Sequence, residues 1–234
     1  MYHYYIFHKP AGCITALRDA THPTILTYLG ALDMTRLRPV GRLDCDTEGL
    51  LILTDDGAYN QYMTHPDRAV EKEYFFWAIG NFTEEKRGKL ESGILLNGEE
   101  KTAVRPAKLT LVQESKLTKI YDYIRGKQKE HILKNRPDTP VFSGYITVTQ
   151  GRKHEVKRLL KSIGCYCVYL KRVRMGDVVL PEDLGVGKVQ EFTPSPFSPC
   201  HHLQGFTIPS FPALTYPLSP NSLRREGKGF PPMP

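Results

Sequence analysis

The chain has 234 residues, of which 40% are hydrophobic and 24% are charged, a composition typical of a soluble globular protein. No apolar run approaches the ~20 residues of a membrane-spanning helix, and the N-terminal residues lack the basic and then apolar pattern of a secretion signal. These features exclude a helical membrane protein and predict a cytoplasmic one.

Strands dominate the predicted elements at the start of the chain. Residues 2–7 alternate in polarity and are rich in aromatics, which predicts a strand. Residues 21–30 predict a short helix with Thr21 as its N-cap. Residues 50–54 form an apolar run typical of a buried strand, and residues 55–57 predict the turn that closes it.

The middle of the chain continues this irregular alternation. Residues 58–64 predict a helical turn, residues 73–79 a strand, and residues 83–90 a capped helix with acids first and bases later. Two shorter strands are predicted at residues 94–96 and 107–112. Residues 114–140 are polar and highly charged, which predicts an insertion loop.

The last elements surround a strongly amphipathic segment. Residues 141–149 alternate as a strand, and residues 154–163 have the apolar spacing of a helix, with Gly164 just past its end. Further strands are predicted at residues 165–170 and 177–180. Strands interrupted irregularly by short helices predict an α+β fold, with a mixed and mostly antiparallel sheet flanked by helices.

The composition changes after residue 191. Residues 192–234 hold ten of the 18 prolines and one acid, Glu226, and they show no helical or strand period. Such a segment buries too little apolar surface to offset its ordering entropy. We therefore predict one catalytic domain at residues 1–191 and a Pro-rich disordered tail at 192–234.

Basic residues are concentrated in one part of a chain whose net charge is +7. Residues 151–175 contain eight Lys or Arg side chains and a single acid, Glu155. A cluster this one-sided favours a polyanion, because neutralising phosphates releases condensed counterions. A membrane surface is a weaker candidate, because the segment lacks the bulky apolar face and the Trp of an interfacial helix.

The five cysteines do not predict a disulfide framework or a metal site. Their number is odd, and Cys165 and Cys167 are one residue apart, which is poor chelating geometry. We interpret Cys165 and Cys167 as small buried thiols in a strand. Cys200 beside His201 and His202 is a weaker metal candidate within the Pro-rich tail.

Residues 41–57 are the most informative stretch. They place Asp44 in a turn beside a Gly and an Arg, followed at once by the apolar run that predicts a strand. A carboxylate beside a cation and braced by a buried strand is a plausible reactive group. Asp46, Asp55 and Asp56 compete for that role on chemistry alone, although Asp46 fits a cap better and the other two fit the turn.

Four segments, taken in order, resemble the RNA pseudouridine synthases, in the branch that modifies ribosomal RNA and includes the small-subunit enzymes. Residues 41–57 resemble the catalytic motif of that family. Residues 4–12, 71–74 and 151–160 resemble its other motifs, and the resemblance covers residues 3–192. From this resemblance we expect the chain to start directly at the catalytic domain, without an S4 domain. This start and the charged insertion are similar to the short subgroup that modifies large-subunit rRNA.

The resemblance implies an isomerase that converts a uridine to pseudouridine, without a cofactor or a metal. It implies that Asp44 is the nucleophile, that Tyr74 stacks on the flipped base, and that Lys157 is the basic partner of Asp44. A turn carboxylate, a core tyrosine and a solvated lysine are the structural alternatives, and Arg158 competes with Lys157. The order of the chemical steps stays open.

The remaining candidates are RNA contacts. The resemblance implies that Arg42 helps to expel or replace the flipped uridine. Basic side chains nearby are candidates for contacts to phosphate, without base specificity: Lys72, Arg152, Lys153, His154 and Arg158. The predicted partner is ribosomal RNA and the predicted state is a monomer. The alternatives are a non-catalytic RNA-binding or ribosome-assembly factor, and a synthase acting on small-subunit rRNA or tRNA.

Overall fold

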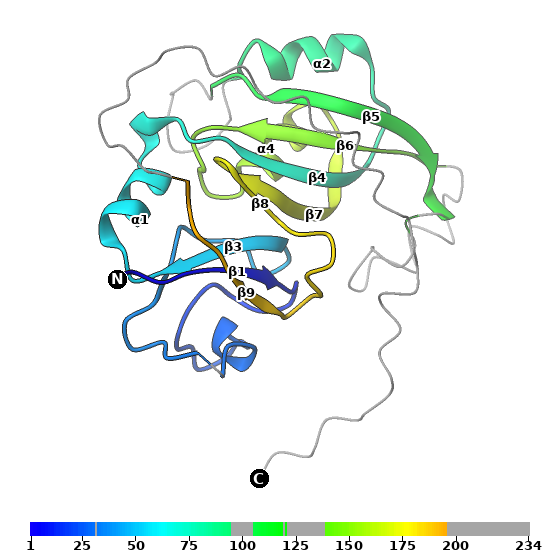
Figure 1. Cartoon of the computed structure of the whole chain (residues 1–234). Helices are drawn as coiled ribbons and strands as arrows, with labels where there is room; N and C mark the ends of the chain where they lie inside the picture. Colours follow the sequence, from blue (N-terminus) through cyan, green and yellow to red (C-terminus); the bar gives the residue numbers. More distant parts are fainter. Residues whose placement is uncertain (31, 95–104, 119, 121–138, 196–234) are drawn as a thin grey trace. The chain divides into compact units, whose positions relative to one another are not determined.

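A mixed sheet of nine strands organises the chain (Figure 1). The structure is a computed structural model, and it describes residues 1–30, 32–94, 105–118, 120 and 139–195. The strands are β1 (Tyr4–Lys9), β2 (Arg38–Pro39), β3 (Glu48–Thr54), β4 (Lys72–Ile79), β5 (Lys108–Lys116), β6 (Pro140–Val148), β7 (Tyr166–Met175), β8 (Val178–Val179) and β9 (Val189–Glu191). The helices are α1 (Gly57–Thr64), α2 (Glu84–Glu91) and α4 (Glu155–Ser162), with 3₁₀ turns η1 (Ile25–Thr27) and η2 (Pro66–Arg68).

The strands follow the order β5-β6-β4-β7-β3-β1-β9, with β2 paired to β3 and β8 to β7. All these pairs are antiparallel except β3 with β7, which run parallel where Gly49 lies opposite Arg172. Gly49 has a φ of +109°, and a Cβ there would lie 2.2 Å from the carbonyl oxygen of Arg172. Only glycine allows this approach, so residue 49 sets the junction between the two halves of the sheet.

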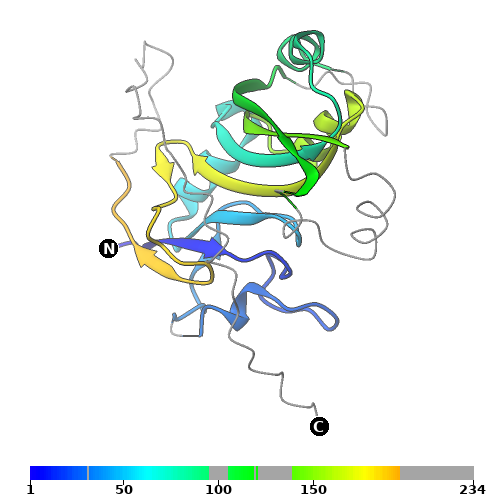
Figure 2. The ribbon, with the colours of Figure 1, turned by 90° about the vertical axis from the view of Figure 1, so that its right-hand side faces the viewer.

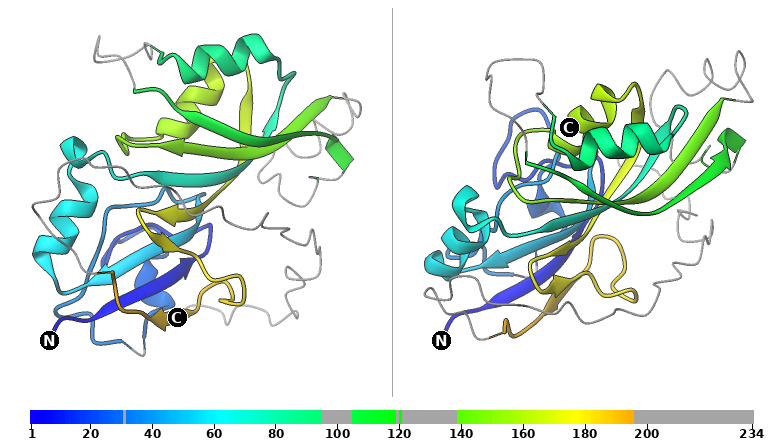
Figure 3. Two further views of the ribbon diagram at one scale, coloured as in Figure 1. Left: turned by 45° about the horizontal axis from the view of Figure 1, so that its top comes forward. Right: turned by 90° about the horizontal axis from the view of Figure 1, so that it is seen from above.

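One half of the sheet comprises β4, β5, β6 and β7, and the helices α2 and α4 pack on one of its faces (Figure 3). Leu90 of α2 and Leu159 and Leu160 of α4 pack with the buried rings of Phe76 and Phe142. The apolar positions of α4 recur at helical spacing, which explains why this short segment is helical and which face it buries.

The other half comprises β1, β3 and β9, which lie below the green and yellow strands in Figure 2. All seven residues of β3 are buried, because both of its faces are covered. Ile52 faces α1 with Tyr59 and Met63, whereas Leu51 and Leu53 face the segment that precedes β2. The strand that follows Asp44 is therefore anchored from both sides.

The structure confirms the α+β class, the mostly antiparallel sheet and most of the predicted elements. The predicted strand at residues 50–54 is β3, and the predicted helix at 154–163 is α4. Thr83 caps α2 as predicted, its side chain accepting a hydrogen bond from the backbone of Lys86. Gly164 follows α4 with a φ of +73°, the left-handed conformation expected after a helix end.

The predicted helix at residues 21–30 is wrong, apart from the short turn η1. Thr24 is extended and forms a β-bridge with Ile14, which draws the chain away from helical geometry. Thr21 is not an N-cap. Its backbone N–H donates to the carboxylate of Asp19 at 2.8 Å, in a local turn before Pro23.

Two further boundaries differ from the prediction. Asp56 is the N-cap of α1 and accepts from the backbone of Tyr59 at 3.0 Å, so residues 55–57 begin a helix in addition to closing a strand. The start of the predicted insertion, residues 114–116, belongs to β5, where charged side chains suit an exposed edge strand. Residues 121–138 and the tail from 196 lie outside the described residues, as does most of the predicted strand at 94–96.

Candidate active site

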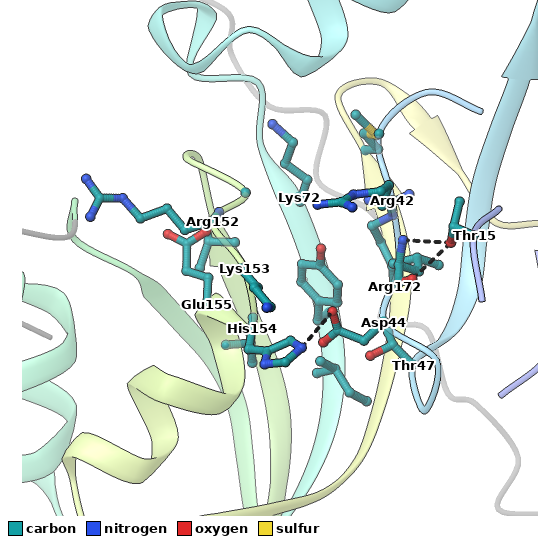
Figure 4. A pocket seen from close by; sticks show the side chains of 18 of the residues that line it. Thr15, Arg42, Asp44, Thr47, Lys72, Arg152, Lys153, His154, Glu155 and Arg172 are labelled. Atoms are coloured by element: carbon teal, nitrogen blue, oxygen red, sulfur yellow. Dashed lines mark hydrogen bonds and ion pairs between the residues drawn. The ribbon is translucent and has the colours of Figure 1, made fainter. Parts of the chain in front are cut away.

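A cavity of about 530 Å³ lies where the two halves of the sheet meet (Figure 4). Its walls come from the loop before β3, from β4 and β7, and from the loop that leads into α4. It brings together seven of the nine predicted site residues: Arg42, Asp44, Lys72, Tyr74, Arg152, Lys153 and His154. Lys157 and Arg158 lie outside its lining, although Lys157 reaches Asp44 from the side.

Lys9 holds the backbone of the loop that carries Asp44. Its ammonium donates to the carbonyls of Asp44 at 3.1 Å, Thr47 at 3.0 Å and Pro10 at 3.0 Å. The side chain is fully buried, and burial lowers the pKa of Lys9 from its usual value. Three carbonyl oxygens compensate for the lost hydration, so this lysine fixes the loop from inside the protein.

Two further contacts hold the same loop. The hydroxyl of Thr15 donates to the carbonyl of Leu43 at 2.9 Å and accepts from its N–H at 3.1 Å. The N–H of Gly12 donates to the carbonyl of Cys45 at 2.7 Å. The segment after β1 thus binds the backbone on both sides of Asp44.

The Asp44 carboxylate meets two basic side chains from the α4 region. Lys157 Nζ lies 2.9 Å from Oδ2, and His154 Nε2 lies 3.5 Å from Oδ1. Lys157 also binds Asp46 Oδ1 at 2.5 Å, so Asp46 is an ion-pair partner and not the cap that the sequence suggested. Burial acts to lower the pKa of Lys157, but the hydrogen bonds with Asp46 and Asp44 outweigh it and raise that pKa.

The backbone before α4 is shaped to present these side chains. Gly151 has a φ of +70° and His154 a φ of +53°, both in the left-handed region. The Glu155 carboxylate turns back and accepts from the N–H of Arg152 at 3.0 Å, which satisfies a free donor at the helix start. His154 therefore ends the loop facing Asp44, while Lys157 follows one turn into the helix.

Tyr74 lies on β4, and its Cα pairs with that of Arg172 on β7. Its ring packs against the core clusters of both halves of the sheet. Burial raises the pKa of Tyr74, and the positive charge of Arg172 opposes that rise only in part. The side chain is therefore a protonated phenol with an apolar ring on the pocket wall.

Two buried cations line the pocket around Tyr74. Lys72 is 4% exposed and Arg172 is 2% exposed. Arg172 Nε donates to the carbonyl of Leu50 at 2.8 Å, but its Nη2 and the Nζ of Lys72 have no hydrogen-bond partner within the described part of the chain. Burial, and then the charge of Arg172, lower the pKa of Lys72 to about 8. This wall favours an anionic ligand.

The remaining basic candidates differ in exposure. Arg42 and Lys153 are exposed and Arg152 is half-buried, and all three line the cavity. Arg158 is half-buried on α4 outside the cavity, so the geometry favours Lys157 over Arg158 as the partner of Asp44. Asp55 binds His3, and Asp56 caps the start of α1. Neither acid lines the cavity.

Sequence reasoning missed Lys9, Thr15 and Arg172 as parts of the site. A signal was present for Lys9, because it precedes a Pro-Ala-Gly turn within a segment that the resemblance had already included. No signal identified Thr15, whose partner Leu43 is 28 residues away. Arg172 was counted only as one of eight basic residues in a cluster.

Within the described ranges, no group of three His, Cys, Asp or Glu side chains could hold a metal ion. Cys165 and Cys167 are free, and burial raises the pKa of Cys167 to about 12. Cys165 is buried as predicted, whereas Cys167 is only partly buried. Cys200, His201 and His202 lie outside the described residues. No helix among those described is long and apolar enough to cross a membrane.

Comparison with known proteins decides the family. The family model described as RNA pseudouridylate synthase matches residues 3–162. The chain belongs to the RNA pseudouridylate synthase family. A crystal structure of a pseudouridylate synthase has the same fold, with a TM-score of 0.63 and 32% identity over 82% of this chain and 71% of that one. The predicted enzyme class is therefore confirmed: the protein is an RNA pseudouridine synthase.

Curated members of the family are similar over most of the described chain. The ribosomal small subunit pseudouridine synthase A of Haemophilus influenzae is 32% identical over 192 residues, which cover 82% of this chain and 71% of that protein. The enzyme of the same name from Escherichia coli K12 is 28% identical, covering 81% and 70%. An uncharacterized RNA pseudouridine synthase of Bacillus subtilis is 32% identical, covering 81% and 70%.

Proposed function

We propose that this synthase isomerises a uridine of ribosomal RNA to pseudouridine, with Asp44 as its nucleophile. The observation that carries the proposal is the position of Asp44, whose carboxylate lies in the cavity and is held by Lys157 at 2.9 Å. The names of the relatives from Haemophilus influenzae and Escherichia coli support ribosomal RNA as the substrate.

The reaction breaks the bond between uracil N1 and the ribose and forms a bond between uracil C5 and the same ribose carbon. No atom is gained overall, and the proton lost from C5 is balanced by the one taken up at N1. A carboxylate serves by attacking carbon, or by removing a proton from the sugar, and by leaving later. Lys157 and His154 keep Asp44 oriented, and the ammonium of Lys157 supplies positive charge beside it.

The flipped uracil stacks on Tyr74 in this proposal. The ring lies on the wall of the cavity, and a phenol that stays protonated adds no charge that would repel an anionic RNA. An aromatic ring stacks on any base, so Tyr74 supplies affinity for an extruded nucleotide more than sequence specificity.

The basic side chains around the cavity contact RNA phosphates. Arg42, Lys153 and Arg152 stand at its edge, and the buried ammonium of Lys72 adds positive charge from within. Phosphate contacts position a nucleic acid without reading its sequence. In this proposal Arg42, which lines the cavity two residues before Asp44, occupies the space that the extruded uridine leaves.

Release of tritium from C5-labelled uridine tests the function, because every turnover replaces the C5–H bond by a C–C bond. The purified protein is incubated with labelled transcripts of small-subunit rRNA, large-subunit rRNA and tRNA. We expect one molar equivalent of tritium from one of the two ribosomal RNAs. Binding of these RNAs without release, in a reaction where a control synthase is active, would instead support a non-catalytic assembly factor.

The same assay separates the candidate targets. The sequence predicts a large-subunit target, whereas the relatives from Haemophilus influenzae and Escherichia coli are named for the small subunit. The small subunit is therefore the second candidate. Release from tRNA alone would contradict both.

A further inference from the structure

Thr15 occupies an unusual place beside the active site, because its hydroxyl makes two hydrogen bonds to a single residue. Oγ1 donates to the carbonyl of Leu43 at 2.9 Å and accepts from the N–H of Leu43 at 3.1 Å, as the dashed lines in Figure 4 show. Leu43 directly precedes Asp44. A side chain far away in the sequence therefore fixes both backbone polar groups of the residue before the carboxylate.

We propose that Thr15 is a positioning residue of this enzyme, which sets the place of the Asp44 carboxylate by anchoring the backbone of Leu43. The proposal rests on the assignment of Asp44 as the nucleophile. A hydroxyl has one donor and two acceptor sites, and the contacts with Leu43 use the donor and one acceptor. Its bonding capacity is thus mostly committed to the loop and not to RNA.

Thr15 is itself held rigidly enough to act as an anchor. Its neighbour Ile14 donates to the carbonyl of Pro23 at 2.9 Å and accepts from the N–H of Ile25 at 3.1 Å. These bonds join the Thr15 segment to η1, whose Ile25 is fully buried in the same core cluster as Leu43. The anchor is therefore connected to the core, and a threonine side chain has few rotamers to lose.

The other contacts to this loop leave a distinct role for Thr15. Lys9 binds the carbonyl of Asp44 and Gly12 binds the carbonyl of Cys45, both on the C-terminal side of the Asp44 N–Cα bond. Thr15 acts on the N-terminal side. If the contacts on either side of Asp44 are lost, its backbone can rotate about the side that is still held. The carboxylate then moves away from its position beside Lys157 and His154.

The experiment uses the full-length protein and compares Thr15→Val with Thr15→Ser. Valine keeps the shape and removes both hydrogen bonds, whereas serine keeps the hydroxyl. Thr27→Val is the matched control, because Thr27 is exposed in η1. Single-turnover tritium release measures the chemical step without product release. RNA affinity and the melting temperature are measured in parallel, together with hydrogen exchange at the Leu43 amide.

We expect Thr15→Val to slow single-turnover release by about 10- to 100-fold, the effect of misplacing a reacting group by ~1 Å. RNA affinity should stay within about twofold of the wild type, the Leu43 amide should exchange faster, and Thr15→Ser should recover most of the rate. A weaker RNA affinity with an unchanged rate would make Thr15 a substrate contact and overturn the proposal. An equally slow Thr15→Ser variant, or an unchanged Leu43 amide, would also overturn it.

Tritium release by the wild-type enzyme tests the proposed function separately from the role of Thr15. If it released no tritium from any RNA, the proposed function would fail. The exchange of the Leu43 amide would still report, independently of activity, whether Thr15 anchors the loop.

Discussion

The base of the pocket and its rim are built in different ways. At the base, which we define as Lys9, Asp44 and Lys157, each side chain makes at least one hydrogen bond of 3.1 Å or less. At the rim, defined as Arg42, Arg152 and Lys153, two of the three side chains are exposed. A reacting carboxylate must be fixed to a fraction of an ångström, whereas a phosphate contact tolerates a mobile cation. Chemistry and RNA affinity should therefore be separable by mutation.

The largest expected effect is that of Asp44→Asn at the base. The amide is not a nucleophile, so tritium release should fall by about a millionfold, the scale seen when a nucleophile is removed. RNA affinity should change little. Single-turnover release and a filter-binding titration measure the two quantities.

Asp46→Asn is the matched control for that variant, because Asp46 lies two residues away and also binds Lys157. We expect it to retain activity within about tenfold, since Lys157 keeps its contact with Asp44. If Asp46→Asn lost activity and Asp44→Asn kept it, the nucleophile would be Asp46.

Lys157→Met should have the second-largest effect on activity. It removes the ammonium that lies 2.9 Å from Asp44 and leaves His154 as the remaining basic contact to the carboxylate given by the structure. We expect kcat to fall by about a hundredfold, similar to the loss of one preorganised charged donor. Lys161→Met, one turn further along α4 and exposed, should be neutral. Equal losses in both variants would mean that Lys157 acts only through the general charge of the helix.

Lys72→Met should raise the stability of the protein by about 3 kcal/mol at neutral pH, because it removes a buried ammonium that has no hydrogen-bond partner among the described residues. The folded pKa of about 8 lies below the usual 10.5, so the unfolded chain binds more protons between these values. Wild-type stability therefore rises with pH across that window. The stability difference between Lys72→Met and the wild type should be complete below pH 8 and absent near pH 10.5. Urea unfolding of both proteins at these two pH values measures it.

The smallest effect is expected at the rim. Lys153→Ala should weaken RNA binding about threefold at low salt and reduce the slope of log affinity against log salt by about one. Its kcat should not change. Lys89→Ala, on α2 and paired with Glu85, is the control and should leave the salt slope unchanged. A loss of kcat in Lys153→Ala would show that base and rim are coupled.

Much of the fold was predictable because its strands and α4 have strong local periodicity. β3 and α4 were predicted to within two residues at each end, because their apolar spacing depends on a few sequence neighbours. The helix predicted at residues 21–30 was wrong because a long-range bridge between Ile14 and Thr24 overrides the local pattern. The strand β9 also went unpredicted, since its pairing with β1 spans most of the chain.

The site residues also differ in whether the sequence could predict them. Asp44, Tyr74 and Lys157 were predictable from motifs, and the structure brings Lys157 and Asp44 into contact although they are 113 residues apart. Thr15 and Arg172 were not predictable as parts of the site, because their roles depend on hydrogen bonds to the backbone of Leu43 and Leu50. Backbone acceptors carry no residue identity, so such partnerships leave no trace in a single sequence.

We propose that Asp44 catalyses the formation of pseudouridine at a defined position of ribosomal RNA. The most direct measurement maps pseudouridines across the ribosomal RNA of a strain that lacks this gene and is complemented with the wild type or with Asp44→Asn. We predict that one position loses its pseudouridine on deletion, regains it with the wild type and stays a uridine with Asp44→Asn. Restoration by Asp44→Asn would show that Asp44 is not the nucleophile, and an unchanged map on deletion would show that the protein does not modify ribosomal RNA.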